Sequence, residues 1–519
     1  MRPWKRTHAA WLAGLTVVAL TGCGEGGQAS DPAATATLSL PSAAYANQCA
    51  PDNPDADPSQ RSGSRRTEMA WLRAMLQERY LWNEDLPSLN MSAPVYQGAP
   101  GQPVDHVTAL NRWLDDLVRP HGDTSRDRFS YRINTAEKDA ADTGTVAGWG
   151  VQLAAVTEHP RRIAITWIDP LGPAAQAGMQ RGDEVVSLDG VAVSVEDAAQ
   201  RAQLDDRLLS APSGTSARWV WRRGGTTEFS QTVVAQAFQS LAVPQVKVLP
   251  TADGAPGPVG YLLFNEFTQP AQQALKVAFT QLAAAQVRDL VLDLRYNGGG
   301  QGFIASQLAY MVAGQATPNR VFNRVRMNAR RTAAGQASDM PFIATTCLDG
   351  DDRCQPGEPL PTLNLRRVFV LTGPNTCSAS ELLINGLRGV DIEVIQVGSG
   401  TCGKPYGYEG ASNCGVTTFA IEMQATNAKG FGDYVDGFQP GGTGPTGLPG
   451  CNAQDDLTHA LGDPEEQMLA TALSFRSSGQ CPIATAQAGG ARSGATQTLR
   501  PLTTRTAPLD LSTGRSRVQ

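Results

Sequence analysis

A serine and a lysine, Ser378 and Lys404, are the residues of this chain whose types and spacing suggest covalent chemistry. They stand 26 positions apart in a chain of 519 residues that has only five histidines. A serine hydroxyl becomes an effective nucleophile when a base takes its proton, and a lysine can be that base where burial makes its ammonium form costly. Serine–lysine pairs are a known variant of the serine–histidine arrangement. The alternative interpretation is a helix-capping serine and a solvated lysine.

The pattern around Ser378 predicts a strand, a helix and a second strand. Arg367–Thr372 is an apolar, β-branched run that ends at Gly373-Pro374-Asn375, which is typical of a buried strand and a turn. The apolar positions of 382–387 follow helical spacing, and Gly389 marks the end of that helix. Ile392–Val397 is the second strand. This order places Ser378 at a helix N-terminus, where positive partial charge favours a developing oxyanion.

A glycine-rich turn follows another apolar run, Leu290–Leu294. Gly298, Gly299 and Gly300 can adopt backbone conformations that other residues resist, so their N–H groups can form an anion nest or half of an oxyanion hole. The spacing fits neither a P-loop nor a dinucleotide fingerprint. An ordinary tight turn is the alternative.

Together the segments LVLDLRYNGGG, SASELLINGLRG and GSGTCGK resemble the C-terminal processing (tail-specific) serine protease family. The resemblance implies an α/β fold with a crotonase-like ββα core. It also implies that Ser378 is the nucleophile, Lys404 the general base and Glu381 an acidic residue that supports the lysine. The N–H groups of Gly299 and Ala379 would form the oxyanion hole.

The chain departs from the family pattern beside the lysine. The family has a glutamine four residues after the lysine, where this chain has Tyr408, and the serine-to-lysine interval is one residue longer than usual. Both departures affect the contacts expected around Lys404.

The same resemblance predicts an inserted, mainly-β PDZ domain over residues 143–238. Gly148, Trp149, Gly150 and Val151 resemble the loop that captures a terminal carboxylate, and the segment from Gly172 to Gly190 resembles the helix, strand and turn that follow. Such a domain adds a peptide strand to an exposed sheet edge. A small β-rich spacer domain is the alternative.

Residues 1–23 have the character of a bacterial lipoprotein signal peptide. Basic residues precede an apolar run from Ala9 to Leu20, and Leu20-Thr21-Gly22-Cys23 resembles a lipobox. The resemblance implies cleavage before Cys23 and a lipid anchor on its sulfur. With Gly24 next, it implies the cell envelope, at the outer membrane facing the periplasm or the cell surface. An ordinary secretory signal with a chance cysteine is the alternative.

The cysteines predict disulfide bonds. Setting Cys23 aside leaves eight of the nine cysteines, an even number in an exported chain. No C-x-x-C pair occurs and the histidines lie elsewhere, so metal binding is not expected. No other cofactor is expected. Cys347 and Cys354 flank a turn-rich loop and are predicted to pair. A bond from Cys402, to Cys377 or to Cys414, would fix the lysine loop, and the sequence leaves both open.

Composition and charge complete the predicted layout. The net charge of −6 and the lack of a basic face exclude nucleic acid as an expected partner. We expect a flexible tether over 24–65, a helical region over 66–142, the catalytic core over 239–483 and a disordered tail over 484–519.

These features favour a serine endopeptidase that cleaves unfolded or C-terminally tagged proteins, with protein or peptide substrates captured by the PDZ domain. A non-catalytic, PDZ-bearing scaffold lipoprotein is the rival. A serine–histidine mechanism also stays open, because folding can bring a histidine to Ser378, although no G-x-S-x-G elbow surrounds that serine. The histidines are His8, His106, His121, His159 and His459.

Overall fold

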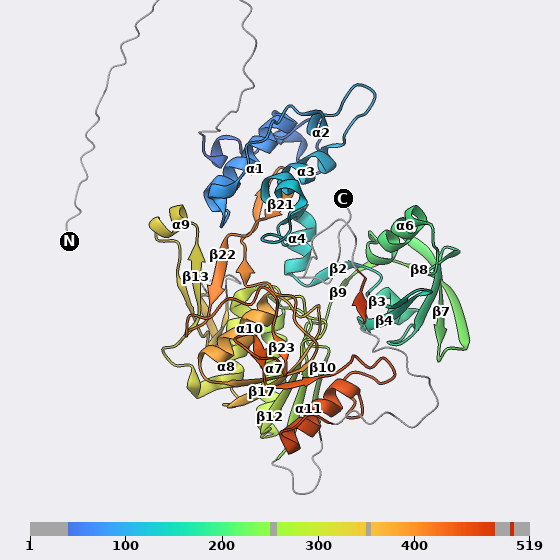
Figure 1. The fold of residues 1–519 in the computed structure, drawn as a ribbon, viewed down its shortest axis with the longest axis vertical. Helices are drawn as coiled ribbons and strands as arrows, with labels where there is room; N and C mark the ends of the chain where they lie inside the picture. The colour runs from blue at the N-terminus through green and yellow to red at the C-terminus, as the bar shows by residue number, and fades with distance from the viewer. Residues whose placement is uncertain (1–39, 250–256, 349–353, 483–498, 503–519) are drawn as a thin grey trace, which may run out of the picture. The chain divides into compact units, whose positions relative to one another are not determined.

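The computed structural model describes residues 40–249, 257–348, 354–482 and 499–502. Its central element is a six-stranded sheet with the order β10-β11-β12-β17-β18-β25 (Figure 1). β10 is antiparallel to β11, and the other neighbours are parallel. The strands are β10 (Gln245–Leu249), β11 (Val259–Leu263), β12 (Asp289–Asp293), β17 (Arg367–Thr372), β18 (Glu393–Gly398) and β25 (Gly450–Asn452).

Alternate residues of these strands face two apolar cores. One core contains Leu292 and Val370, and includes α7 (Ala271–Ala284), α8 (Gly302–Ala313) and α10 (Ala379–Gly389). The other contains Val291 and Phe369, and includes α11 (Gln467–Ser478). Burial on both faces explains why the strands are continuous apolar runs. The arrangement confirms the predicted α/β core, and the strand, helix and strand expected around Ser378 are β17, α10 and β18.

The N-terminal region is mainly helical. Its helices are α1 (Arg65–Arg79), α2 (Pro94–Gln97), α3 (His106–Val118) and α4 (Thr135–Asp142). Ser64 and Asp105 cap α1 and α3, because each side chain accepts a hydrogen bond from a backbone N–H of the first turn. The apolar faces of α1 and α3 share one core, in which Trp113 is fully buried.

The flexible tether expected over 24–65 is wrong for residues 40–64, which pack on the folded chain. This stretch contains the short helices η1 (Ser42–Ala44) and η2 (Pro58–Gln60), and Cys49 forms a disulfide with Cys414. The buried Glu68 carboxylate accepts hydrogen bonds from the backbone of Ala50 and the side chain of Asn53. The polar, turn-forming composition that suggested a tether instead supplies local turns between these fixed points.

A second sheet forms the region predicted as a PDZ domain, with the order β26-β3-β4-β5-β7-β8 and β6 paired to β5. Its strands are β3 (Val151–Glu158), β4 (Arg161–Ile168), β5 (Glu184–Leu188), β6 (Val191–Ala192), β7 (Ser216–Arg223), β8 (Thr227–Val234) and β26 (Arg500–Pro501). Helices α5 (Pro173–Gln176) and α6 (Ala198–Leu209) belong to it. β2 (Thr145–Gly148) and β9 (Gln236–Gln239) pair near the predicted ends of the domain.

Smaller sheets and a short helix surround the central one. One sheet joins β1 (Tyr131–Asn134), β21 (Val416–Phe419) and β20 (Ala411–Asn413), and another joins β14 (Asp339–Pro341), β13 (Val321–Met327), β22 (Met423–Thr426) and β19 (Tyr406–Gly407). Two-stranded pairs are β15 (Thr345–Cys347) with β16 (Pro356–Pro359), and β23 (Gln439–Pro440) with β24 (Gly447–Leu448). The helix is α9 (Ala329–Ala333).

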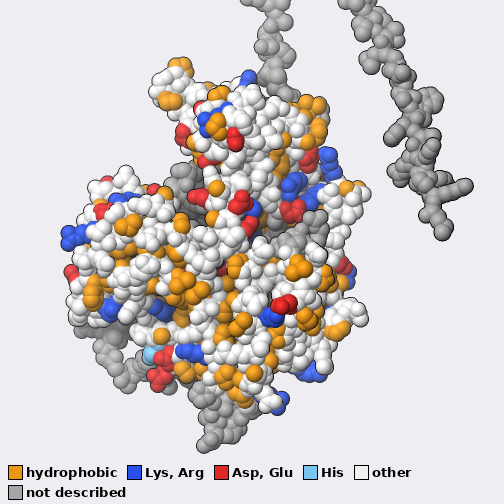
Figure 2. Space-filling view, turned by 180° about the vertical axis from the view of Figure 1, so that it is seen from behind, with side chains coloured by type: hydrophobic (Ala, Val, Ile, Leu, Met, Phe, Trp, Pro, Cys, Tyr) orange, Lys and Arg blue, Asp and Glu red, His pale blue; other side chains and the backbone are white. Residues whose placement is uncertain are grey.

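The expectation of a disordered tail over 484–519 is wrong for 499–502, since β26 pairs with β3 there. The predicted signal peptide and Cys23 lie outside the described residues. Within the described ranges, no helix has both the length and the apolar character needed to cross a bilayer. Acidic and basic side chains are interspersed over the face shown in Figure 2.

Candidate active site

The residues singled out in the sequence converge at the carboxyl ends of three neighbouring parallel strands. Gly299 follows β12, Ser378 follows β17 and Lys404 follows β18. The loops after parallel strands meet at one edge of a sheet, which is where open α/β sheets bind their ligands. Three segments that are far apart in the chain therefore share one site.

Ser378 occupies a strained turn at the N-terminus of α10. Its backbone has φ 54° and ψ −112°, which is unfavourable for a residue with a side chain. The turn is held by Thr376, whose hydroxyl donates to the carbonyl of Leu294 over 2.8 Å. Ser378 is half-exposed, whereas Ala379 behind it is buried. The strained turn thus places a partly exposed serine at a buried helix terminus.

The glycine-rich turn lies directly against this serine. A Cβ on Gly299 would lie 2.8 Å from the Cβ of Ser378 and 2.9 Å from the N of Ala379, so only glycine fits. The φ of Gly299 is 108°. Asn297 fixes the turn: its side chain donates to the carbonyl of Phe264 over 2.9 Å and accepts the N–H of Gly299 over 2.9 Å. Gly299 and Ala379 are therefore neighbours, as an oxyanion hole requires.

The N–H of Ala379 is the freer of the two predicted oxyanion donors. As the first residue of α10 it belongs to the turn whose N–H groups have no partner within the helix. The N–H of Gly299 donates to Asn297, so a substrate oxyanion would share or replace that bond.

The buried carboxylate of Glu381 joins the serine turn to the lysine loop. It accepts hydrogen bonds from the N–H of Ser378 (3.0 Å), the hydroxyl of Thr401 (2.6 Å), and the N–H groups of Gly403 and Lys404 (2.8 Å each). Burial raises the pKa of Glu381, and these donors oppose that shift. Glu381 thus positions both predicted catalytic residues through their backbones.

The side chain of Lys404 is 97% buried and is enclosed by aromatic rings. Its Nζ lies 3.9 Å from the ring centroid of Tyr408 and 5.5 Å from that of Phe129. A cation over a ring face is attracted by the ring quadrupole. Among the described residues, no hydrogen bond joins this amine to the hydroxyl of Ser378. Tyr408, which stands where the resemblance predicts a glutamine, therefore contributes a ring face to the surroundings of the lysine.

A disulfide between Cys377 and Cys402 ties the two loops together, with Cα atoms 5.2 Å apart. Of the two pairings left open for Cys402, this one forms, and Cys414 pairs with Cys49. The predicted bond between Cys347 and Cys354 is confirmed. Cys451 and Cys481 form the remaining pair.

Cys377, Glu381 and Cys402 approach one another within 4.8 Å, the spacing of a metal site. Both sulfurs are consumed by the disulfide, so they cannot act as thiolate ligands.

The histidines whose contacts are defined are engaged elsewhere. His106 contacts Glu68 at 3.0 Å, and His459 contacts Asp456 at 2.5 Å. These contacts give no support to the serine–histidine alternative.

The predicted carboxylate loop of the PDZ domain lies at the start of β3. The indole of Trp149 is buried and donates to the carbonyl of Arg207 at the end of α6, over 2.9 Å. The carbonyls of Trp149 and Gly150 accept bonds from Ala174 and Asp169. Within the described ranges, the N–H groups of Trp149 and Gly150 have no hydrogen-bond acceptor, as a carboxylate nest needs.

Two contributors to the site were not predicted from the sequence. Asn297 was seen only as part of a glycine-rich motif, although a buried amide in such a turn is a signal of hydrogen bonding. Phe129, from the segment before β1, reaches Lys404 from 275 positions away. Nothing local in the sequence indicates that contact.

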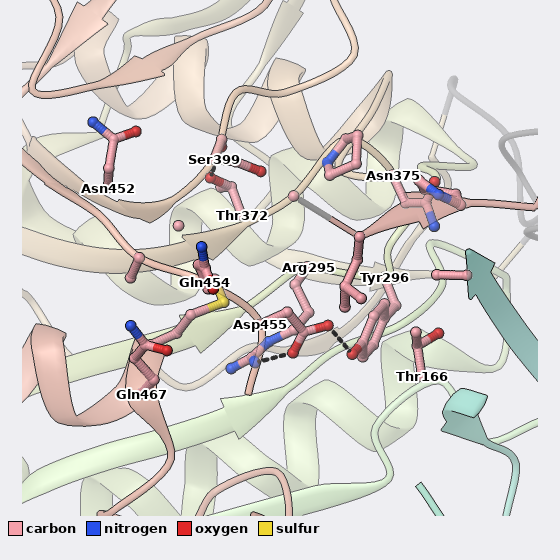
Figure 3. Close-up of a pocket in the computed structure, with 18 of the residues that line it drawn as sticks. Thr166, Arg295, Tyr296, Thr372, Asn375, Ser399, Asn452, Gln454, Asp455 and Gln467 are labelled. Atoms are coloured by element: carbon pink, nitrogen blue, oxygen red, sulfur yellow. Dashed lines mark hydrogen bonds and ion pairs between the residues drawn. The ribbon is translucent and has the colours of Figure 1, made fainter. Parts of the chain in front are cut away.

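A cavity of about 500 Å³ adjoins the site. Figure 3 shows Asp455 joined to Arg295 and to Tyr296 near its centre, and Asn375, three residues before the serine, also lines the cavity. Thr166 of the predicted PDZ region is drawn beside Tyr296 in Figure 3.

Two segments of the chain match known family models. Residues 258–412 match Peptidase family S41, and residues 164–223 match the PDZ domain. The chain is therefore similar to S41 peptidases over the first of these segments and to PDZ domains over the second. The S41 match contains Gly299, Ser378, Glu381 and Lys404, whereas the PDZ match begins after the loop Gly148–Val151.

Curated relatives are C-terminal processing peptidases. A chloroplastic C-terminal processing peptidase of Tetradesmus obliquus is 30% identical over 207 residues, which cover 38% of this chain and 42% of that protein. A carboxyl-terminal-processing protease of Synechocystis is 26% identical over 269 residues, 50% of this chain and 54% of that protein. The chain thus spans about half the length of these relatives.

A solved structure shares the fold of the S41 and PDZ regions. A Bacteroides fragilis protein assigned as an S41 protease superposes with a TM-score of 0.55 at 23% identity, covering 78% of this chain and 97% of that one. The two chains therefore share their overall fold.

Proposed function

We propose that this protein is a serine endopeptidase in which Ser378 is the nucleophile and Lys404 the general base. The observation that carries the proposal is the Glu381 carboxylate, which holds the backbones of both residues through 3.0 and 2.8 Å hydrogen bonds. A buried carboxylate with four protein donors in one site is a costly arrangement that positions a serine and a lysine together.

In the proposed reaction the Lys404 amine turns from the ring of Tyr408 toward Ser378. It takes the hydroxyl proton as the serine oxygen attacks a peptide carbonyl. The N–H groups of Ala379 and Gly299 stabilise the oxyanion, the protonated lysine gives its proton to the leaving amine, and water releases the acyl-enzyme. Hydrogen bonds absent before substrate binds are expected to form in the complex.

The substrates we propose are unfolded or C-terminally tagged protein chains. The PDZ match and the open N–H groups of Trp149 and Gly150 support capture of an extended chain, with β3 as the receiving strand. Four disulfides support a site of action outside the cytoplasm. We further propose that a lipid on Cys23 anchors the protein in the cell envelope.

The decisive experiment compares cleavage of β-casein by the chain from Gly24 onward and by its Ser378→Ala and Lys404→Arg variants. Arginine keeps the positive charge but its guanidinium does not release a proton, so it cannot act as base. We expect cleavage by the unaltered protein alone. Cleavage by Ser378→Ala at the unaltered rate would refute the assignment, and inactivity of all three would favour the binding-protein alternative.

The proposed anchor has its own test. Cys23→Ala should move the protein from the membrane fraction to the soluble fraction of cells, while Cys49, being in a disulfide, provides no lipidation site. An unchanged distribution would contradict lipidation at Cys23.

A further inference from the structure

The outer edge of β3, in the PDZ sheet, is already paired with a segment of this same chain. β26 pairs antiparallel with β3, with Arg500 opposite Ala155 and Pro501 opposite Ala154. The N–H of Leu502 donates to the carbonyl of Leu153 over 3.0 Å. In Figure 1 the red arrow of β26 lies beside β3, although the two are more than 300 residues apart in the sequence.

The direction of β26 is the direction of a PDZ ligand. From Arg500 to Leu502 the segment runs from Ala155 toward Leu153, and hence toward the start of β3 and the open N–H groups of Gly150 and its neighbour. An added peptide strand gains affinity from backbone hydrogen bonds and specificity from alternate side chains. The segment 499–502 makes such a backbone hydrogen bond, from Leu502 to Leu153.

Alternate side chains of the segment face two different environments. Leu502 packs against the apolar core of the PDZ region, which includes Leu153. Leu499 and Pro501 line the cavity shown in Figure 3, together with Tyr296 and Asn375 of the peptidase domain. This two-residue period is that of a strand inserted between two surfaces. The segment therefore covers the PDZ edge and one wall of the cavity next to the catalytic turn.

We infer that residues 499–502 are an internal ligand of the PDZ domain, which an incoming peptide must displace from β3. The inference rests on the proposed function only in taking β3 as the strand that receives substrate. The competing ligand is an extended peptide with a leucine-sized apolar residue opposite Leu153. Displacement opens the edge of β3 and the cavity wall together.

The expected gain in peptide affinity follows from the covalent link between the segment 499–502 and the PDZ domain. A tethered ligand competes at an effective concentration in the millimolar range, so a peptide of micromolar intrinsic affinity binds the intact chain far more weakly. Removing the internal ligand should tighten peptide binding at least tenfold.

The experiment measures binding of a fluorescein-labelled peptide with the sequence Thr-Leu-Arg-Pro-Leu, that of residues 498–502, ending in a free carboxylate. The full chain carries Ser378→Ala so that the probe is not cleaved. Leu502→Asp places a charge against the apolar PDZ core and should release the segment. Leu348→Asp makes the same substitution at a 65% exposed leucine and serves as the control.

We expect at least tenfold tighter binding to the Leu502→Asp chain than to the Ser378→Ala parent and to the Leu348→Asp control. Equal affinity in all three, or no binding to any, would overturn the inference. A second variant with residues 499–502 replaced by Gly-Ser-Gly-Ser should show the same gain, and a retained cooperative thermal transition shows that the domain remains folded.

Failure of the inference and failure of the proposed function give different results. Casein cleavage with Ser378 intact reports on catalysis, whereas peptide affinity in the Ser378→Ala background does not depend on it. Tighter binding without any cleavage would support the internal ligand and refute the peptidase. Casein cleavage with unchanged peptide affinity would support the peptidase and refute the internal ligand.

Discussion

The Glu381 carboxylate shows how one residue can position two others. We expect Glu381→Gln to lower kcat at least tenfold and the free energy of unfolding by about 1–3 kcal/mol, because an amide NH₂ would face donors that lose their acceptor. KM should change little, since Glu381 meets no substrate. Steady-state kinetics measure kcat and KM, and thermal denaturation measures stability. Glu84→Gln, at an exposed position, is the control. A Glu381→Gln enzyme with unaltered kcat would contradict this role.

Gly299 has no room for a side chain, because Ser378 and Ala379 lie beside it. Gly299→Ala should reduce kcat by about 10²–10³, the cost of losing one oxyanion donor, because its Cβ would lie 2.9 Å from the N of Ala379. Gly302→Ala is the matched control: its Cβ would meet only side-chain atoms at 3.7 Å or more. Equal kcat in the two variants would exclude Gly299 from the hole.

At the scale of elements, the disulfide between Cys377 and Cys402 joins the loops that follow β17 and β18. Replacing both cysteines by alanine should lower kcat at least tenfold, because the serine turn and the lysine loop lose their covalent link. The chain-entropy model gives a stability loss of roughly 3 kcal/mol for a loop of this length. Activity and denaturation of the double variant measure both effects.

The bond between Cys451 and Cys481 provides the control for that prediction. It closes a loop of similar length, with a sequence separation of 30 against 25, but lies outside the catalytic loops. Its removal should cost a similar free energy of unfolding and leave kcat unchanged. Loss of activity in both double variants would mean that the effect is one of stability alone.

The elements near the serine could be predicted because their signals are local. The apolar run of β17, the helical spacing of α10 and its terminal Gly389 lie within 23 residues. The contacts that complete the site are not local: Phe129 reaches Lys404, and Cys49 reaches Cys414, only after the chain has folded. β26 was missed because a strand of only two residues, Arg500–Pro501, forms only when an existing sheet edge supplies the partner.

At the scale of the whole molecule, Asp455 connects the PDZ-like region to the central α/β domain. It pairs with Arg181 from the turn after α5 and, over 2.8 Å, with Arg295 from the loop after β12. Burial by itself would raise the pKa of Asp455, but the charges of these arginines outweigh it and hold the pKa below its ordinary value near 3.8.

Asp455 should therefore make the free energy of unfolding depend on pH in the acidic range. As pH falls below about 4, the unfolded chain takes up this proton before the native one does, so the native state loses stability. Unfolding measured between pH 3 and 7 should show this fall, and Asp455→Asn should be less stable at pH 7 and approach the unaltered protein at pH 3. Asp391→Asn, at an exposed ion pair, should match the unaltered protein throughout. Parallel curves for Asp455→Asn and the unaltered protein would exclude this contribution.

The bond between Cys49 and Cys414 closes a covalent ring that contains the whole PDZ match, the serine and the lysine. A peptidase that nicks its own chain once inside this ring would remain a single covalent molecule. Such self-processing would be invisible on a non-reducing gel and would separate into fragments only after reduction. The ring therefore lets the molecule survive a cut that would divide a linear chain.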